Sequence, residues 1–95
     1  MPTTTRPFDM AEQLRDQQDI ASNLNLVLEE GDPGELAHAL GVIARARGMT
    51  QIAAEAGMGR EALYKALRAD ASPRFETILK VMHALGLRLS VQPAA

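Results

Sequence analysis

Apolar residues recur every three or four positions along most of the chain, which is the spacing of one face of an α-helix. A capping pattern at Asp9 and Glu12 predicts a short first helix through about Arg15, and Asp16 with Asp19 predicts a second start. Glycines follow most of the later periodic segments and mark their ends. The sequence therefore predicts an all-α fold, with further helices over about 16–30, 33–47, 50–56, 60–69 and 75–85.

The clearest helix start is the run Asp32-Pro33-Gly34-Glu35. Asp32 is a preferred N-cap, Pro33 suits the first helical position, and Glu35 completes a capping box. Inside the same helix Gly41 costs about 1 kcal/mol relative to alanine. We therefore expect another part of the chain to approach the backbone closely at Gly41.

The segment 49–68 has the features of a helix-turn-helix. Two steeply crossing helices need a small residue where they touch, and Ala53 is at that place. The turn needs a residue that tolerates a positive φ, which Gly57 provides. Apolar residues would anchor both helices to the core: Ile52, Ala56, Met58, Leu63, Ala66 and Leu67.

The remaining positions of the second helix are long, polar and mostly basic, as a surface that reads a DNA groove requires. We expect Arg60, Tyr64 and Lys65 to reach base edges, and Gln51 and Arg68 to hold phosphates. The full candidate DNA-binding set is Gln51, Gly59, Arg60, Glu61, Tyr64, Lys65 and Arg68. The alternative is an ordinary helical hairpin whose outer face is only solvated.

The last helix is marked by Phe75, Ile78, Leu79, Met82 and Leu85, and Gly86 closes it. Residues 87–92 then alternate apolar and polar, which is strand periodicity. A single strand cannot satisfy its own backbone groups, so it would pair with another chain or remain a tail. We expect antiparallel pairing across a two-fold axis in a homodimer, with the dimerisation residues Leu87, Leu89 and Val91 facing the core.

Charge is unevenly distributed along a chain whose formal net charge is −2. Residues 1–40 carry two basic and eight acidic side chains, giving −6, whereas residues 41–95 carry eight basic and four acidic ones, giving +4. An acidic front and a basic back indicate two partners of opposite charge. A solvated surface with chance segregation is the alternative.

The composition excludes several kinds of chemistry. The chain has no cysteine, so it has no disulfide and no thiolate zinc site, which suits a reducing cytoplasm. No signal peptide or membrane-spanning stretch is evident. His38 and His83 lack neighbouring carboxylates at metal-ligand spacing, and Ser22, Ser72 and Ser90 lack a base. We expect a cytoplasmic protein that is not an enzyme, with no catalytic residues, metal or cofactor.

With the motif placed, the chain from about Phe8 to Val91 resembles the addiction-module antidote (antitoxin) proteins with a lambda-repressor-like helix-turn-helix. The resemblance lies in ordered segments: Phe8-Asp9 with Leu14, Asp19-Ile20-Ala21 with Leu24, 28–32, 43–53, 63–67, and Pro73 through Leu87. Gly59 and Arg74 depart from it where a capping hydroxyl is expected, and Asn23 departs where an aromatic is common. The resemblance implies neutralisation of a RelE-like ribonuclease toxin and repression of the protein's own promoter.

These inferences divide the chain into a flexible tail (1–7), an acidic helical arm (8–31), a DNA-binding domain (32–86) and a dimerisation strand with tail (87–95). The arm is the candidate toxin-binding region, through Phe8, Leu14, Ile20 and Leu24. The partners implied are double-stranded operator DNA, a RelE-like toxin and a second copy of the chain, with no membrane. Two rivals remain: a stand-alone phage- or plasmid-type repressor without a toxin, and a protein inhibitor that no longer reads DNA.

Overall fold

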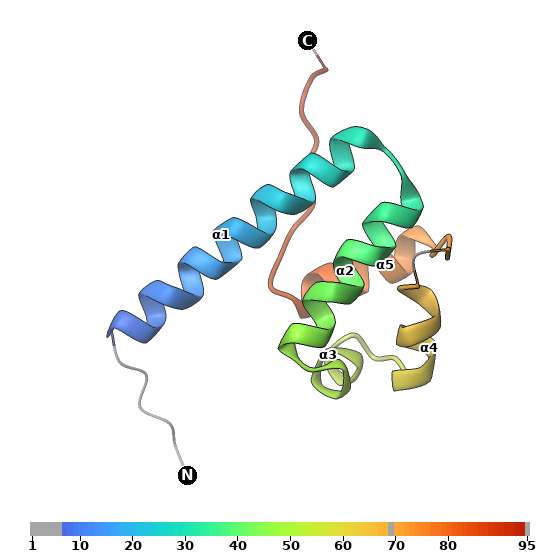
Figure 1. Ribbon diagram of the computed structural model, residues 1–95, viewed down its shortest axis with the longest axis horizontal. Helices are drawn as coiled ribbons and strands as arrows, with labels where there is room; N and C mark the ends of the chain where they lie inside the picture. The colour runs from blue at the N-terminus through green and yellow to red at the C-terminus, as the bar shows by residue number, and fades with distance from the viewer. Residues whose placement is uncertain (1–6, 69, 95) are drawn as a thin grey trace.

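The computed structural model describes residues 7–68 and 70–94, with side chains from Arg15 onward. The described residues form five helices and no strand, which confirms the all-α prediction (Figure 1). The helices are α1 (Pro7–Glu30), α2 (Pro33–Arg47), α3 (Met49–Glu55), α4 (Arg60–Ala66) and α5 (Phe75–Ala84). The tail predicted at 1–7 lies outside the described residues except for Pro7.

Helix α1 is one continuous helix from Pro7 to Glu30, so the predicted break at about Arg15 is wrong. No glycine or proline follows Pro7 within this segment, and nothing in the backbone therefore interrupts the helical hydrogen bonds. Asp16 and Asp19 are exposed to solvent, where a helix interior accepts them at small cost. The first half of α1 projects beyond the other helices (Figure 1).

The turn between α1 and α2 follows the predicted capping signals in part. Gly31 adopts φ +75°, and Asp32 accepts a hydrogen bond on Oδ1 from the Gly34 N–H at 2.9 Å. Pro33 is the first residue of α2. The capping box is incomplete, because in the described residues no hydrogen bond joins the Asp32 N–H to the Glu35 carboxylate.

The core is made of aliphatic side chains contributed by every helix. Its largest fully buried members come from α2, α4, α5 and the residues just after them: Leu40, Leu63, Leu67, Val81 and Leu85. Helix α1 adds Leu24, which is 2% exposed. No polar or charged side chain is buried among the described residues, so burial of apolar surface is the main stabilising term.

Gly41 lies against the end of α4, as its place inside a helix predicted. A Cβ atom built on Gly41 would lie 2.9 Å from the backbone oxygen of Leu67 and 3.4 Å from its Cβ. The absence of a side chain at Gly41 therefore sets how closely α2 approaches the end of α4.

From the end of α4 onward, the structure differs from the prediction at three places. Helix α4 ends at Ala66 instead of about residue 69. Phe75, predicted to mark the apolar face of α5, is 67% exposed because it begins the helix, ahead of the buried residue Ile78. Leu87 and Leu89 are half-buried as expected, but Val91 is 98% exposed and does not face the core of the single chain.

Replacing Gly41 with alanine is expected to destabilise the fold by about 1–3 kcal/mol, although alanine is the better helix former. The added methyl group meets a backbone oxygen, which cannot move aside as a flexible side chain can. Urea denaturation measures the change. The control is Ala46→Gly at an exposed position of α2, which loses about 1 kcal/mol from helix propensity alone. A gain of stability in Gly41→Ala would contradict the close contact.

Candidate nucleic-acid interface

Helices α3 and α4 are joined by the turn 56–59 and pack against each other. Gly57 adopts φ +68°, as predicted, and the Met58 N–H donates to the Ala53 oxygen at 2.9 Å. Ala53 is 3% exposed, which agrees with a small residue at the contact of the two helices. This hydrogen bond and the Gly57 conformation fix where α4 begins.

The predicted apolar anchors hold this α3–turn–α4 unit to the core. Four of them are buried and two are half-buried: Ile52, Ala56, Leu63 and Leu67, then Met58 and Ala66. Because these residues occupy one side of each helix, the opposite side is left to solvent.

The exposed side carries most of the residues predicted to bind DNA. Gly59, Arg60, Glu61, Lys65 and Arg68 are exposed along α4 and its ends, and Gln51 is exposed on α3. Gly59 caps α4 with its backbone alone, which agrees with the missing hydroxyl noted in the sequence. Arg74, at the start of α5, likewise supplies no side-chain cap.

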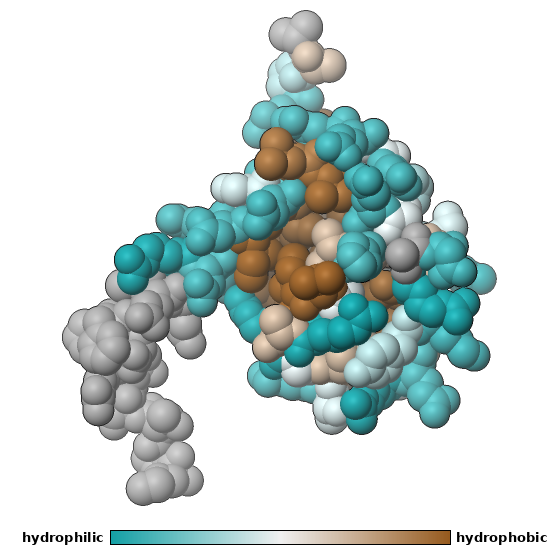
Figure 2. Space-filling model, in the orientation of Figure 1, coloured by the Kyte–Doolittle hydropathy of each residue, from teal (hydrophilic) through white to brown (hydrophobic). Residues whose placement is uncertain are grey.

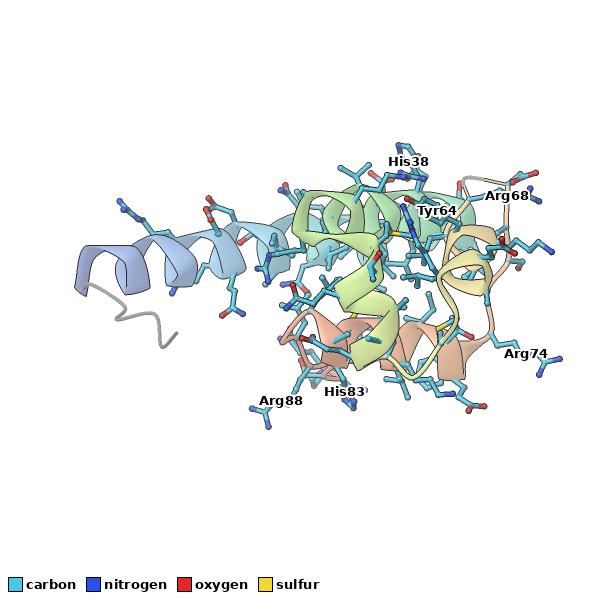
Figure 3. All side chains as sticks on the ribbon, turned by 90° about the horizontal axis from the view of Figure 1, so that it is seen from below. His38, Tyr64, Arg68, Arg74, His83 and Arg88 are labelled. Carbon is cyan, nitrogen blue, oxygen red and sulfur yellow. The ribbon has the colours of Figure 1, made fainter. Side chains whose placement is uncertain are left out.

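Tyr64 differs from its neighbours because it is half-buried and packs against the core. Two guanidinium groups lie near its ring: the Cζ of Arg60 is 5.5 Å and the Cζ of Arg45 is 5.9 Å from the ring centroid. These separations are within cation–π range. Figure 3 shows Tyr64 on α4 beside α2, with Arg68 farther along the chain.

Arg45 was missed by the sequence reasoning, which considered only α3 and α4. It comes from the last turn of α2, which also carries Arg47. The only signal in the sequence was this pair of basic residues before Gly48. Among the described residues Arg45, Arg60 and Lys65 form no ion pair, so their positive charge is uncompensated there.

Two candidate phosphate contacts already have partners in the chain. Gln51 donates from Nε2 to Glu55 Oε1 at 3.2 Å, and Arg68 Nε lies 3.6 Å from Asp70 Oδ1. Both pairs are exposed, and exposed pairs contribute little to stability. A phosphate can therefore compete for these donors.

The structure keeps the two histidines apart (Figure 3). His38 and His83 are exposed on opposite faces of the molecule (Figure 3), and no group of three potential metal ligands occurs among the described residues. Within the same residues, no helix combines the length and hydropathy needed to cross a membrane.

The four residues predicted to bind a toxin differ in burial where their side chains are described. The side chains of Phe8 and Leu14 lie outside the described residues. Ile20 is half-buried against the core, and Leu24 is 2% exposed. Leu24 is therefore a core residue, and a partner could contact it only if the core opened.

Carboxylates crowd together where α1 turns into α2. Glu30, Asp32 and Glu35 are all exposed there. Hydrogen bonding with the Glu30 carboxyl group and its negative charge raise the pKa of Glu35, and the nearby Asp32 adds to the shift. In the described residues no cation forms an ion pair with any of the three. We name Glu29, Glu30, Asp32 and Glu35 the acidic corner.

The exposed basic residues of α4, Arg60 and Lys65, form the basic face, which lies on a different element from the acidic corner. Residues 4–93 match the family model described as "Probable addiction module antidote protein". The chain belongs to this antidote family. Antidote proteins act on the toxin of an addiction module, so membership indicates an antitoxin role and implies a toxin partner.

A relative of this antidote protein occurs in Haemophilus influenzae (strain ATCC 51907 / DSM 11121 / KW20 / Rd). It is 47% identical over 92 residues, covering 97% of this chain and 95% of the relative, and is described as an uncharacterized protein. No solved structure matches the chain.

The acidic corner predicts a pH-dependent stability. Because the pKa of Glu35 is raised in the folded state, the stability from its bound proton is present at low pH and lost as the pH rises through that pKa. Glu35→Gln removes the charge, so we expect a small increase in melting temperature at pH 7 that shrinks toward pH 4. Thermal melts across this range test it, with Glu29→Gln as control. A gain that does not vary with pH would contradict the proposed repulsion.

Proposed function

We propose that this protein is the antitoxin of a type II toxin–antitoxin module in the cytoplasm. It neutralises a RelE-like ribonuclease toxin and, as a homodimer, represses its own promoter. The observation that carries the proposal is the antidote-family match over residues 4–93. The stand-alone repressor is the alternative, and the neighbouring reading frame separates the two: a short basic protein there favours the antitoxin.

Repression would use the α3–turn–α4 unit as a lambda-repressor-like helix-turn-helix, with α4 in the major groove. Support comes from the exposed, mostly basic side of α4 and from the uncompensated charges of Arg60 and Lys65. Arg60 and Lys65 reach base edges, and Gln51 and Arg68 hold phosphates. Tyr64 also reaches a base edge, and its ring lies within cation–π distance of Arg60 and Arg45.

Arg60→Ala is expected to weaken binding to the promoter by about 1–3 kcal/mol and to relax its sequence preference, because a base contact is lost. Lys65→Ala should behave similarly, whereas Arg68→Ala should weaken all sequences alike. Gel shifts on the promoter and on a scrambled duplex measure both effects. Lys80→Ala on α5, where Lys80 pairs with Glu76 at 3.2 Å, is the control. Unchanged promoter binding by Arg60→Ala and Lys65→Ala would exclude α4 as the reading helix.

The homodimer would form by antiparallel pairing of residues 87–92 across a two-fold axis, which sets two reading helices about 34 Å apart. Support comes from Leu87 and Leu89, which are half-buried while Arg88, Ser90 and Val91 are exposed. The inward side chains fix the segment to the core. The Leu87 N–H donates to the Met82 oxygen at 2.8 Å, so the backbone of residues 88–92 is the part that would pair with a second copy.

Ending the chain after Leu89 is expected to convert the dimer to a monomer, because residues 90–92, half of the paired segment, are removed. Leu87 and Leu89 are kept because both pack against the core. Sedimentation equilibrium measures the mass, and circular dichroism checks that the helices remain. A truncated chain that stays fully dimeric would refute strand pairing, though not dimerisation.

Toxin binding would involve the arm 8–31, whose first half projects beyond the body of the molecule (Figure 1). Deleting residues 1–15 removes none of the side chains known to be in the core. We expect the deletion variant to bind the promoter normally but to lose growth rescue from the co-expressed neighbouring toxin. If rescue persists, the first half of α1 is not required for inhibition.

A further inference from the structure

An apolar groove lies at the corner where α1 turns into α2. It has a volume of about 270 Å³, and its walls come from both sides of that turn, from the start of α5 and from the C-terminal segment. Its large apolar side chains are Val27, Leu28, Leu36, Phe75, Ile78 and Leu89. The groove therefore joins parts of the chain that are far apart in sequence.

Two of the large hydrophobic side chains that line the groove are exposed to solvent. Phe75 is 67% exposed and Leu28 is 37% exposed. Exposed apolar surface that is gathered in one place marks a binding surface more often than scattered single residues do. Figure 2 shows apolar surface gathered between α1 and α2 on the viewed face. A second hollow shares Val27 and Asp32 with the groove.

Two residues of the acidic corner lie at or beside the groove. Asp32 lines the groove itself, and Glu35 lines the second hollow beside it. Among the described residues these carboxylates have no cationic partner, and Glu30 and Glu35 repel one another. A positively charged partner would relieve this repulsion, whereas DNA would increase it.

We propose that this groove binds a basic segment of the toxin, inserting one large apolar side chain while flanking lysines or arginines contact Glu30, Asp32 and Glu35. The proposal rests on the antitoxin function proposed above and locates the contact on the α1–α2 corner, beyond the projecting half of α1. The apolar insertion sets residence time, and the carboxylates steer the encounter.

A second copy of the chain fits the groove less well. An interface whose two-fold axis passes close to the groove would bring the acidic corners of the two copies together, which like charges oppose. Strand pairing through residues 87–92 uses the backbone edge of that segment, whereas the groove uses the side chain of Leu89. Both contacts can therefore exist in one complex.

Lysine substitutions at matched positions test the groove. Leu28→Lys and Phe75→Lys alter its walls, whereas Leu26→Lys and Val42→Lys change the exposed residues of α1 and α2 that do not line it. Calorimetry with the purified basic protein of the neighbouring reading frame measures affinity. We expect the groove variants to bind about tenfold or more weakly and the control variants to stay within about twofold. All four should bind promoter DNA normally, which shows that they are folded.

Association kinetics test whether the carboxylates of Glu30 and Glu35 steer the toxin to the groove. The double variant Glu30→Gln/Glu35→Gln is expected to associate several-fold more slowly at low salt, with a flatter salt dependence and an unchanged dissociation rate. A lower association rate at every salt concentration without flattening would overturn the role of the carboxylates.

Three outcomes would overturn the proposal and are distinguishable. If Leu28→Lys and Phe75→Lys bind the toxin as the wild type does, the groove is not the contact and the antitoxin function stands. If the wild type itself does not bind, the proposed function fails together with the groove. If Leu28→Lys binds toxin normally but sediments as a monomer, a second copy occupies the groove.

Discussion

The contact between Gly41 and the backbone oxygen of Leu67 sets how α2 and the end of α4 lie together, and the basic face depends on it. A Cβ atom on Gly41 would lie 2.9 Å from this oxygen, which leaves no room for a methyl group. Because α4 has only seven residues, its position comes from packing and not from its own helical stability. Leu63 and Leu67, both fully buried, complete the attachment.

The attachment of α4 to the core also explains why Arg45 and Arg60 both lie near the ring of Tyr64. With α4 held close to α2, the side chain of Arg45 reaches one α4 residue, Tyr64, whose ring also lies within cation–π distance of Arg60. The three side chains form a cationic cluster drawn from two helices, although the whole chain carries a net negative charge. A cluster of this kind is suited to a polyanion, since local charge and not net charge decides what a surface attracts.

The acidic residues lie elsewhere for an equally simple reason. Asp32 is an N-cap, and Glu35 falls in the first turn of α2, where negative charge suits the helix dipole. Local stability of α2 therefore accounts for part of the acidic corner. Capping does not account for Glu30, whose carboxyl group lies beside that of Glu35 and raises the pKa of Glu35. This excess of negative charge beside an apolar groove is what helix capping does not explain.

The sequence alone determined the features that arise from local backbone chemistry. Gly31, Gly48, Gly57 and Gly86 mark the turns and helix ends because their positive φ values suit glycine, and apolar periodicity identified the buried side of each helix. Only the tertiary structure decided which surfaces meet. It joined the two predicted helices of the arm into one, buried Leu24, left Phe75 exposed, and brought Arg45 to Tyr64. The physical reason is that periodicity depends on neighbours a few positions away, whereas Phe75, Leu28 and Leu89 become neighbours only when helices distant in sequence pack together.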